Sequence, residues 1–304
     1  MGSVTEAASF AGRSKVAVTR RSVLVGLIGK GIQMSRTPAM HEVEGRELGL
    51  NLVYTLLDTD RMGPSVPSLS ELIRYAACFG FSGVNVTYPY KQEILGLLDQ
   101  LSNDVAAIGS VNTVIFEGGR RIGHNTDLWG FRESFRRNMA GATRDTVLLI
   151  GAGGAGSAVA QALLDCGTGE ILVHDIQAAR AEVLAMRLTS RFGAGRISAI
   201  SDISTVAAAV DGIVNATPVG MAKLPGTPID TALLHPRMWV ADIVYFPLET
   251  EFLKAARRIG CRTMGGEGMA VFQAVRAFEL FTGLAPSSMR MQAAFAACEN
   301  IPAG

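Results

Sequence analysis

The stretch TVLLIGAGGAGSAVAQALL, residues 146–164, carries the clearest structural signal in the chain. A short aliphatic run leads into Gly151, Gly153 and Gly156, and an alanine-rich helical segment follows. In a dinucleotide-binding turn of this pattern, the first glycine allows a tight turn, the second admits pyrophosphate, and the third lets helix and strand pack closely. The N–H groups and positive dipole of the helix start favour the diphosphate. A purely structural glycine turn is the weaker alternative, so the sequence predicts a Rossmann-like domain.

The same stretch runs for 19 residues without a charge, which is nearly the length of a membrane span. Its cluster of glycines and the short periodic segments on both sides disfavour that interpretation. We expect no membrane association.

Asp175 ends the next predicted strand, EILVHD, 19 residues after Gly156. A carboxylate at this place accepts hydrogen bonds from the ribose hydroxyls and repels a 2′-phosphate. Ile176 follows, where a phosphate-binding site would want arginine. The pattern favours NAD and disfavours NADP. Arg180 lies one helical turn further on, where it could stack on adenine or be solvated.

Strand-like and helix-like segments alternate on both sides of this turn. The expected strands are 22–29, 51–58, 82–89, a hairpin over 111–126 turning at Gly118-Gly119, 146–150, 170–175, 212–217 and 239–245. The expected helices are 38–48, 68–80 with a capping box at Ser68 and Glu71, 91–101, 127–139, 154–166, 178–192, 249–259, 268–282 and 286–299. This alternation predicts an α/β protein of two domains with mostly parallel sheets.

The domain boundary is expected near residue 127, with the last helices returning to the first domain. We therefore assign 22–126 plus 266–304 to one domain and 127–265 to the dinucleotide-binding domain. Residues 1–21 have no apolar core of a secretory signal and are expected to be a disordered tail, although an organellar transit segment stays open.

Composition excludes several classes of protein. Among 304 residues, 28 Lys and Arg face 27 Asp and Glu, so no net field favours nucleic acid or an anionic membrane. With 48% apolar residues the chain can bury a sizeable core. Four widely spaced cysteines without a CxxC suit a reduced cytoplasmic protein, and four histidines without ligand spacing predict no metal.

Polar residues recur inside apolar segments of the first half. They are Ser35, Thr37, Asn85, Thr87, Lys91, Asn112 and Asp127. Taken singly, Ser35 and Asp127 could cap helices and Asn112 could stabilise a turn. Taken together, they describe a hydroxyl-rich pocket with one cation and one carboxylate.

Eight motifs resemble those of the shikimate dehydrogenase family, and most closely its NAD-dependent quinate/shikimate dehydrogenase branch. In chain order they are SRTPAMH, NVTYPYKQ, GSVNT, GHNTD, GAGGAGSA, NATPVGM, DIVY and GMAVFQA. They span roughly residues 25–285, and their conjunction is far more specific than any one of them.

The resemblance implies a role for each matching residue. It implies that Lys91 and Asp127 are the catalytic pair. The residues implied to hold a cyclic polyhydroxy acid, shikimate or quinate, are Ser35, Thr37, Thr87, Asn112, Tyr245 and Gln273. The implied cofactor contacts are Gly151, Ala152, Gly153, Gly154, Ala155, Asp175, Arg180, Thr217, Ile243 and Gly266. The implied fold is an N-terminal substrate domain and a Rossmann-like domain with the active site in the cleft between them.

Two departures from the biosynthetic members bear on specificity. Ser35-Arg36-Thr37 stands where those members usually have Ser-x-Ser, and Asp175-Ile176-Gln177 stands where they usually have Asn-Arg-Thr. The second departure puts the use of NADP in doubt.

The residue chemistry fits an alcohol oxidation that needs no metal. Such a reaction removes a hydride, to C4 of nicotinamide, and a proton, from the hydroxyl. Lys91 can give or take that proton, and Asp127 can orient the pair. Hydroxyls of Ser35 and Thr37 would bind the substrate carboxylate. Arg36 could help, but we expect it to point away between its two pocket-facing neighbours.

The sequence therefore predicts an NAD-preferring dehydrogenase acting on shikimate and quinate. Three alternatives stay open: a strictly biosynthetic NADP-linked enzyme, a non-catalytic dinucleotide sensor, and a methylene-tetrahydrofolate-type dehydrogenase. Asp175-Ile176 disfavours the first, Lys91 and Asp127 the second, and the NVTYP and GHNTD segments the third. Either a monomer or a homodimer is compatible with the sequence.

Overall fold

Apolar runs in the second half form a six-stranded sheet in the order β12-β11-β10-β7-β8-β9, with every pairing parallel. The computed structural model describes residues 20–298. The strands are β7 (Thr146–Ile150), β8 (Glu170–His174), β9 (Ile197–Ala199), β10 (Gly212–Asn215), β11 (Trp239–Asp242) and β12 (Arg262–Met264). Central strands such as β7 are buried on both faces, which is why they read as continuous apolar runs.

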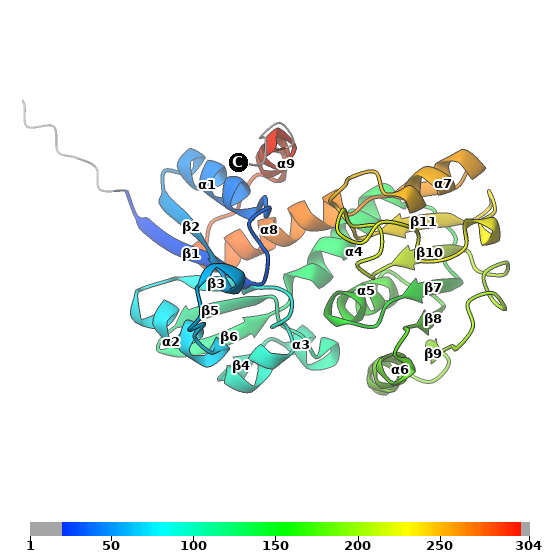
Figure 1. The fold of residues 1–304 in the computed structure, drawn as a ribbon, viewed down its shortest axis with the longest axis horizontal. Helices are drawn as coiled ribbons and strands as arrows, with labels where there is room; N and C mark the ends of the chain where they lie inside the picture. The colour runs from blue at the N-terminus through cyan, green and yellow to red at the C-terminus, as the bar shows by residue number, and fades with distance from the viewer. Residues whose placement is uncertain (1–19, 299–304) are drawn as a thin grey trace, which may run out of the picture.

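The first half contains a second six-stranded sheet, in the order β2-β1-β3-β5-β6-β4 (Figure 1). Its strands are β1 (Ser22–Gly29), β2 (Asn51–Asp58), β3 (Gly83–Val86), β4 (Gln100–Leu101), β5 (Thr113–Glu117) and β6 (Arg120–His124). β1 pairs in parallel with β2 and β3, whereas the predicted hairpin β5–β6 is antiparallel, so this sheet is mixed. The prediction of an α/β protein with two domains is confirmed.

Helices cover both sheets, and all but α3 lie close to predicted positions. They are α1 (Thr37–Glu47), α2 (Leu69–Cys78), α3 (Asn103–Ile108), α4 (Thr126–Asn138), α5 (Gly154–Asp165), α6 (Ala178–Phe192), α7 (Glu251–Ile259), α8 (Glu267–Thr282) and α9 (Ser288–Ala297), with 3-10 turns at Thr59–Arg61, Glu93–Leu97 and Thr231–Leu233. The capping box of Ser68 and Glu71 is present at the start of α2. None of the helices among the described residues is long and apolar enough to cross a membrane.

The helix expected over 91–101 is wrong. The segment forms a 3-10 turn over Glu93–Leu97 and then the short strand β4, which pairs with β6. Gly96 weakens a helix at its middle, and the pairing with β6 requires an extended chain at Gln100. The sequence patterns also missed β9, β12 and α3, since each of them is short.

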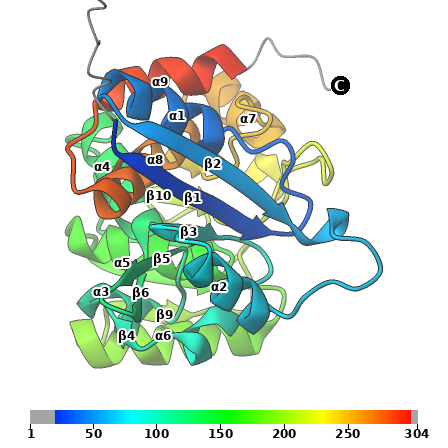
Figure 2. The ribbon, with the colours of Figure 1, turned by 90° about the vertical axis from the view of Figure 1, so that its left-hand side faces the viewer.

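Helices α4 and α8 join the two halves (Figure 1). They cross closely at Gly130, where a Cβ atom would lie 2.7 Å from the Met269 carbonyl oxygen and the Gln273 nitrogen. Buried residues of α8 and α9 share a core with β1 and β2, and α1 and α9 lie together over these strands (Figure 2). Helices α8 and α9 therefore pack on the first half. The predicted tail, up to residue 19, lies outside the described residues, as does residue 299 of the last expected helix.

Candidate active site

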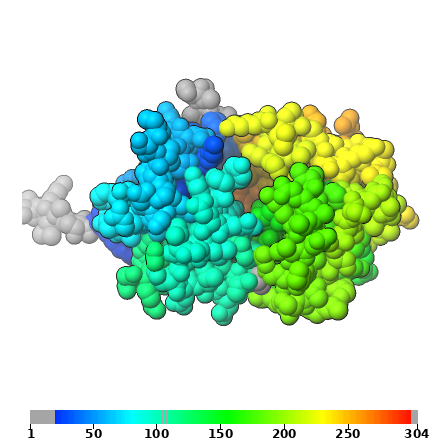
Figure 3. All heavy atoms as spheres, turned by 60° about the horizontal axis from the view of Figure 1, so that its bottom comes forward, coloured from blue at the N-terminus to red at the C-terminus, as the bar shows by residue number. Residues whose placement is uncertain are grey.

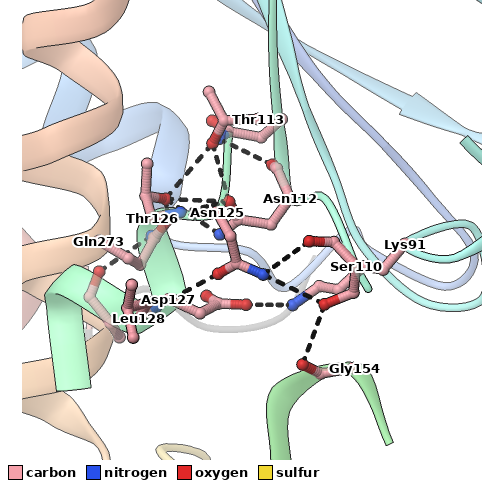
Figure 4. A network of polar contacts seen from close by, with 12 residues as sticks. Lys91, Ser110, Asn112, Thr113, Asn125, Thr126, Asp127, Leu128, Gly154 and Gln273 are labelled. Atoms are coloured by element: carbon pink, nitrogen blue, oxygen red, sulfur yellow. Dashed lines mark hydrogen bonds and ion pairs between the residues drawn. The ribbon is translucent and has the colours of Figure 1, made fainter. Parts of the chain in front are cut away.

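Lys91 and Asp127 form an ion pair, although they lie 36 residues apart in the chain. Lys91 follows the end of β3, and Asp127 is the second residue of α4. The distance from Nζ to Oδ2 is 2.5 Å, and 20% and 9% of the two side chains are exposed (Figure 4). The pair is therefore shielded from bulk water but still reachable, as an acid/base pair must be.

Asn125, and not Asp127, caps α4. Its Oδ1 accepts a hydrogen bond from the N–H of Leu128 at 3.2 Å, while its Nδ2 donates to the carbonyl and hydroxyl oxygens of Ser110. The cap suggested for Asp127 is thus wrong. Because Asn125 occupies that position, the Asp127 carboxylate is left to face Lys91.

A buried network fixes the other polar side chains of the first half (Figure 4). Asn112 Oδ1 accepts the Thr126 N–H at 2.7 Å, and its Nδ2 donates to Thr126 Oγ1 at 3.0 Å. The Thr126 hydroxyl donates to Gln273 Oε1 at 3.4 Å, which joins α8 to the start of α4. Asn85 is buried to the same extent as Asn112; it accepts from the Tyr54 hydroxyl at 2.8 Å, and its Nδ2 donates to the Asn112 carbonyl at 3.2 Å. The network holds α4, and with it Asp127, in one orientation.

The glycine turn of the second half lies against this pair. The Ser110 hydroxyl donates to the Gly154 carbonyl at 3.1 Å. A Cβ atom at Gly154 would lie 3.5 Å from Lys91 Cδ. The surface is hollowed between the two halves here (Figure 3). The Lys91–Asp127 pair and the glycine turn therefore lie side by side.

The backbone around Gly151, Gly153 and Gly156 has the geometry that the glycine motif predicts. Gly151 has φ +103°, which disfavours other residues. A Cβ at Gly156 would lie 2.0 Å from the Gly151 carbonyl oxygen, so α5 packs tightly on the turn. Around a Cβ at Gly153, by contrast, no described atom lies within 4 Å. The turn thus leaves open space at the α5 N-terminus, which fits a diphosphate approaching the backbone N–H groups.

Asp175 holds the same turn from the end of β8. Its Oδ2 accepts the Ala152 N–H at 2.8 Å and its Oδ1 accepts the Gln177 N–H at 2.9 Å. Each carboxylate oxygen retains a further lone pair for a ribose hydroxyl. Ile176 is 94% exposed beside it, and Arg180 is exposed on α6.

The remaining predicted cofactor residues surround the ends of β10 and β11. Thr217 donates to Asn215 Oδ1 at 2.7 Å, and the Ile243 N–H donates to the Asn215 carbonyl. A Cβ at Gly266 would lie 2.3 Å from the Ile243 carbonyl oxygen. Asn215 also donates to Asp242, whose pKa is raised by burial against the effect of its hydrogen bonds. The sequence motifs contained Asn215 and Asp242 but gave them no role.

Ser35 and Thr37 lie at the start of α1. The Ser35 hydroxyl donates to Thr37 Oγ1 at 3.2 Å, and Arg36 occupies the N-cap position. Thr87 is half-buried, with its N–H donating to the Ile28 carbonyl and its methyl group against Gly29. Ser35 and Thr37 thus lie in the connection from β1 to α1, and Thr87 directly follows β3.

Tyr245 follows β11 and reaches toward the first half. The residue is 40% exposed, and its ring centroid lies 6.1 Å from that of Phe295 of α9. The pKa of its phenol is raised, first by the loss of water around it and then by the negative charge of Asp127, while Arg36 acts in the opposite direction. Arg36 was expected to point away, but its charge reaches this phenol.

Ser110, Asn125 and Thr126 are site residues that the sequence reasoning missed. Each lies within a motif, GSVNT or GHNTD, beside a residue that was chosen. The sequence did offer a signal for them, because each is a polar residue close to a predicted site residue within an otherwise apolar segment. Among residues 20–298, no three His, Cys, Asp or Glu side chains gather closely enough to hold a metal ion.

An ion pair set against a dinucleotide turn, between two α/β domains, defines a two-domain dehydrogenase. Two family models match the chain: the shikimate dehydrogenase substrate binding domain over residues 27–114, and shikimate / quinate 5-dehydrogenase over residues 133–232. The chain belongs to the shikimate dehydrogenase family, which confirms the resemblance carried by the eight motifs.

Three relatives illustrate the range of the family. The chain is 51% identical to a shikimate dehydrogenase (NADP(+)) of Streptomyces avermitilis, covering 91% of this chain and 96% of that protein. It is 48% identical to a quinate/shikimate dehydrogenase (NAD(+)) of Corynebacterium efficiens, covering 90% and 98%. The structure of the quinate dehydrogenase from Corynebacterium glutamicum in complex with NAD superposes with a TM-score of 0.87 at 45% identity, covering 91% and 100%.

Proposed function

We propose that this protein is an NAD-preferring dehydrogenase that interconverts shikimate with 3-dehydroshikimate and quinate with 3-dehydroquinate. The observation that carries the proposal is the Lys91–Asp127 pair at 2.5 Å beside Gly154 of the dinucleotide turn. Residues 22–126 with 266–304 form the substrate domain in this proposal, and residues 127–265 form the dinucleotide-binding domain.

In this proposal the first-half residues bind two different parts of the substrate. Ser35 and Thr37 hydrogen-bond its carboxylate, while Thr87, Asn112, Tyr245 and Gln273 hold its ring hydroxyls. Asn112 and Gln273 are supported by the Thr126 hydroxyl, so their amide groups are oriented before the substrate arrives.

Lys91 moves the proton of the reacting hydroxyl. In oxidation its neutral amine accepts that proton, and in reduction its ammonium donates a proton to the carbonyl oxygen. Asp127 positions Nζ through the 2.5 Å contact and accepts a hydrogen bond from the hydroxyl. The dinucleotide, when bound, supplies the hydride acceptor or donor.

The second-half residues hold the cofactor in this proposal. The backbone from Gly151 to Ala155 takes the diphosphate, Asp175 the ribose hydroxyls, and Arg180 the adenine face. Thr217, Ile243 and Gly266 line the nicotinamide end. The fixed carboxylate of Asp175 beside the apolar Ile176 supports NAD over NADP.

A second candidate is a strictly NADP-linked shikimate dehydrogenase. One observation favours it: the 51% identical relative carries the name shikimate dehydrogenase (NADP(+)). The two candidates differ in their cofactor and in whether quinate is a substrate.

The proposal is tested by mixing the purified protein with NAD and either acid and following the absorbance of NADH. We expect turnover of both acids by wild type and by Lys254→Ala, which removes an exposed lysine of α7 far from the pair. Lys91→Ala should lose turnover of both. A wild-type protein that turns over neither acid with either dinucleotide would contradict the proposal.

A further inference from the structure

Ser110 links the two halves of the molecule beside the Lys91–Asp127 pair and the glycine turn. Its side chain is fully buried, and its hydroxyl donates to the Gly154 carbonyl at 3.1 Å. The same hydroxyl accepts a hydrogen bond from Asn125 Nδ2, also at 3.1 Å (Figure 4). A serine hydroxyl has one hydrogen to donate and two lone pairs to accept with. This hydroxyl therefore bonds at once to the first residue of α5 and to the cap of α4.

Both members of the ion pair are attached to the segment around Ser110. The N–H of Val111, the next residue, donates to the Lys91 carbonyl at 2.8 Å. Asn125 caps the first turn of α4, which carries Asp127. A movement of Ser110 would therefore move the backbone of Lys91 and the first turn of α4 together.

Gly154 lies against these groups from the other half. A Cβ atom at Gly154 would lie 3.5 Å from both Ser110 Cβ and Lys91 Cδ. A second tie lies two residues before Ser110, where Arg187 NH1 of α6 donates to the Ile108 carbonyl at 2.6 Å. The segment around Ser110 is thus hydrogen-bonded to α5 and α6 as well as to Lys91 and the cap of α4.

The proposed reaction depends on the spacing of these two parts of the site. Lys91 must reach the reacting hydroxyl of the bound acid, and the glycine turn must hold the dinucleotide against the carbon of that hydroxyl. An error of about 1 Å in such an arrangement costs about 100-fold in rate. The Ser110 hydroxyl is a direct bond between the turn and the segment that carries the pair.

We propose that Ser110 is a positioning residue that couples the glycine turn to the Lys91–Asp127 pair. Ordering of the turn by a bound dinucleotide then also orders the first turn of α4, through Gly154, Ser110 and Asn125. The inference rests on the proposed function, since that function gives the turn a dinucleotide and the pair a proton transfer.

The first test measures the coupling without turnover. Amide hydrogen exchange over residues 125–131 is followed by mass spectrometry, without dinucleotide and with NAD at a concentration that saturates each variant. NAD should slow this exchange about fivefold or more in wild type, the lower end of a typical coupling, and should not slow it in Ser110→Ala. The variant should fold, because the Ser110 carbonyl still accepts from Asn125 at 3.0 Å and the Arg187 tie remains.

The second test separates the chemical step from binding. With enzyme in excess and both ligands saturating, Ser110→Ala should form NADH from shikimate about tenfold or more slowly in a single turnover. The dissociation constants for NAD and shikimate should stay within about threefold of wild type, because each ligand keeps its own contacts. Ser110→Cys keeps a weak donor in a similar volume and should lie between Ser110→Ala and wild type in both tests.

Ser134→Ala is the matched control. It removes an equally buried serine hydroxyl from the same helix that carries Asp127, where the hydroxyl contacts Met264 Sδ and Asn138 Nδ2. It should match wild type in exchange, in single-turnover rate and in both dissociation constants.

An equal slowing of exchange by NAD in wild type and Ser110→Ala would overturn the inference, and so would the absence of slowing in wild type. A wild-type single-turnover rate in Ser110→Ala would overturn it as well. Failure of the proposed function is distinct from these results, since wild type would then bind no NAD or turn over neither acid.

Discussion

The two halves of the site are built in different ways. In the second half, a six-residue stretch from Gly151 to Gly156 shapes the dinucleotide turn almost entirely with backbone. In the first half, side chains from β3, the β3–β5 connection, α4 and α8 converge through hydrogen bonds among Asn112, Thr126 and Gln273. A backbone site is encoded locally, whereas a side-chain site exists only after distant segments have packed.

This difference predicts where single substitutions act. Changes in the first half should alter chemistry and specificity, because in the proposed function its side chains face the substrate. Changes in the glycine turn should alter either stability or cofactor binding, depending on whether the added atom meets protein or open space.

The largest effect is expected at the acid/base pair. Lys91→Ala should lower kcat at least 100-fold, the usual contribution of a positioned acid or base, with a modest change in KM. Asp127→Asn should be similarly damaging, because an amide cannot pair with the lysine charge. Steady-state rates with the oxidised dinucleotide and shikimate measure both. A Lys91→Ala enzyme that retains a tenth of the wild-type kcat would remove the lysine from the mechanism.

The glycine turn offers a matched pair of alanine substitutions. Gly156→Ala places a Cβ 2.0 Å from the Gly151 carbonyl oxygen, so we expect a loss of about 1–3 kcal/mol in stability and a lower Tm. Gly153→Ala meets no described atom within 4 Å and should leave the Tm unchanged, while weakening NAD binding at least about tenfold. Thermal unfolding and NAD titration separate the two. Equal effects of both substitutions on Tm would show that the space at Gly153 is not reserved for a ligand.

The sequence predicted features that depend on local patterns and failed for features that depend on distant contacts. Helix α6, the hairpin at Gly118-Gly119 and the Ser68 capping box were predicted from local patterns and are present. The helix predicted over 91–101 was wrong because the end of that segment pairs with β6, and no local pattern contains this contact. The alternative role of Asp127 as the cap of α4 is wrong because Asn125 and Asp127 are both good capping residues, and only the position of the first turn decides between them.

Among the site residues too, those set by a local motif were predicted and those set by distant contacts were missed. The sequence motif located the glycine turn, and the structure brings Lys91 and Asp127, both chosen from the sequence, within 2.5 Å of each other. Ser110 and Thr126 were missed because their roles depend on groups in other segments, Gly154 and Gln273. The position of Arg36 depends on Phe295, which is remote in the chain.

The cofactor preference should respond to two positions after β8. Asp175→Asn with Ile176→Arg should shift the NADP-to-NAD ratio of kcat/KM about tenfold or more toward NADP, by removing repulsion and adding a phosphate partner. Asp175→Asn alone should mainly weaken NAD, because the asparagine amide nitrogen cannot accept one of the two backbone N–H groups that the carboxylate now accepts. Kinetics of both variants with both dinucleotides check this. A single Asp175→Asn variant that gains NADP at full strength would contradict the structural role of Asp175.

The smallest effect is expected at Thr37. The threonine keeps the hydroxyl that serine would supply, and its methyl group restricts the rotamers of that hydroxyl. Thr37→Ser should shift the quinate-to-shikimate ratio of kcat/KM by about fivefold, on the order of 1 kcal/mol, with less change in overall activity. Paired kinetics on the two acids measure the ratio. An unchanged ratio would place quinate discrimination elsewhere in the pocket.

The most direct test of the whole account is the wild-type kcat/KM for the four pairings of quinate or shikimate with NAD or NADP. The fixed carboxylate of Asp175 and the hydroxyl pair of Ser35 and Thr37 predict oxidation of both acids, with NAD preferred over NADP for each. Better use of NADP than of NAD, with quinate inert where shikimate turns over, would contradict it and assign this chain to the NADP-linked, shikimate-only class.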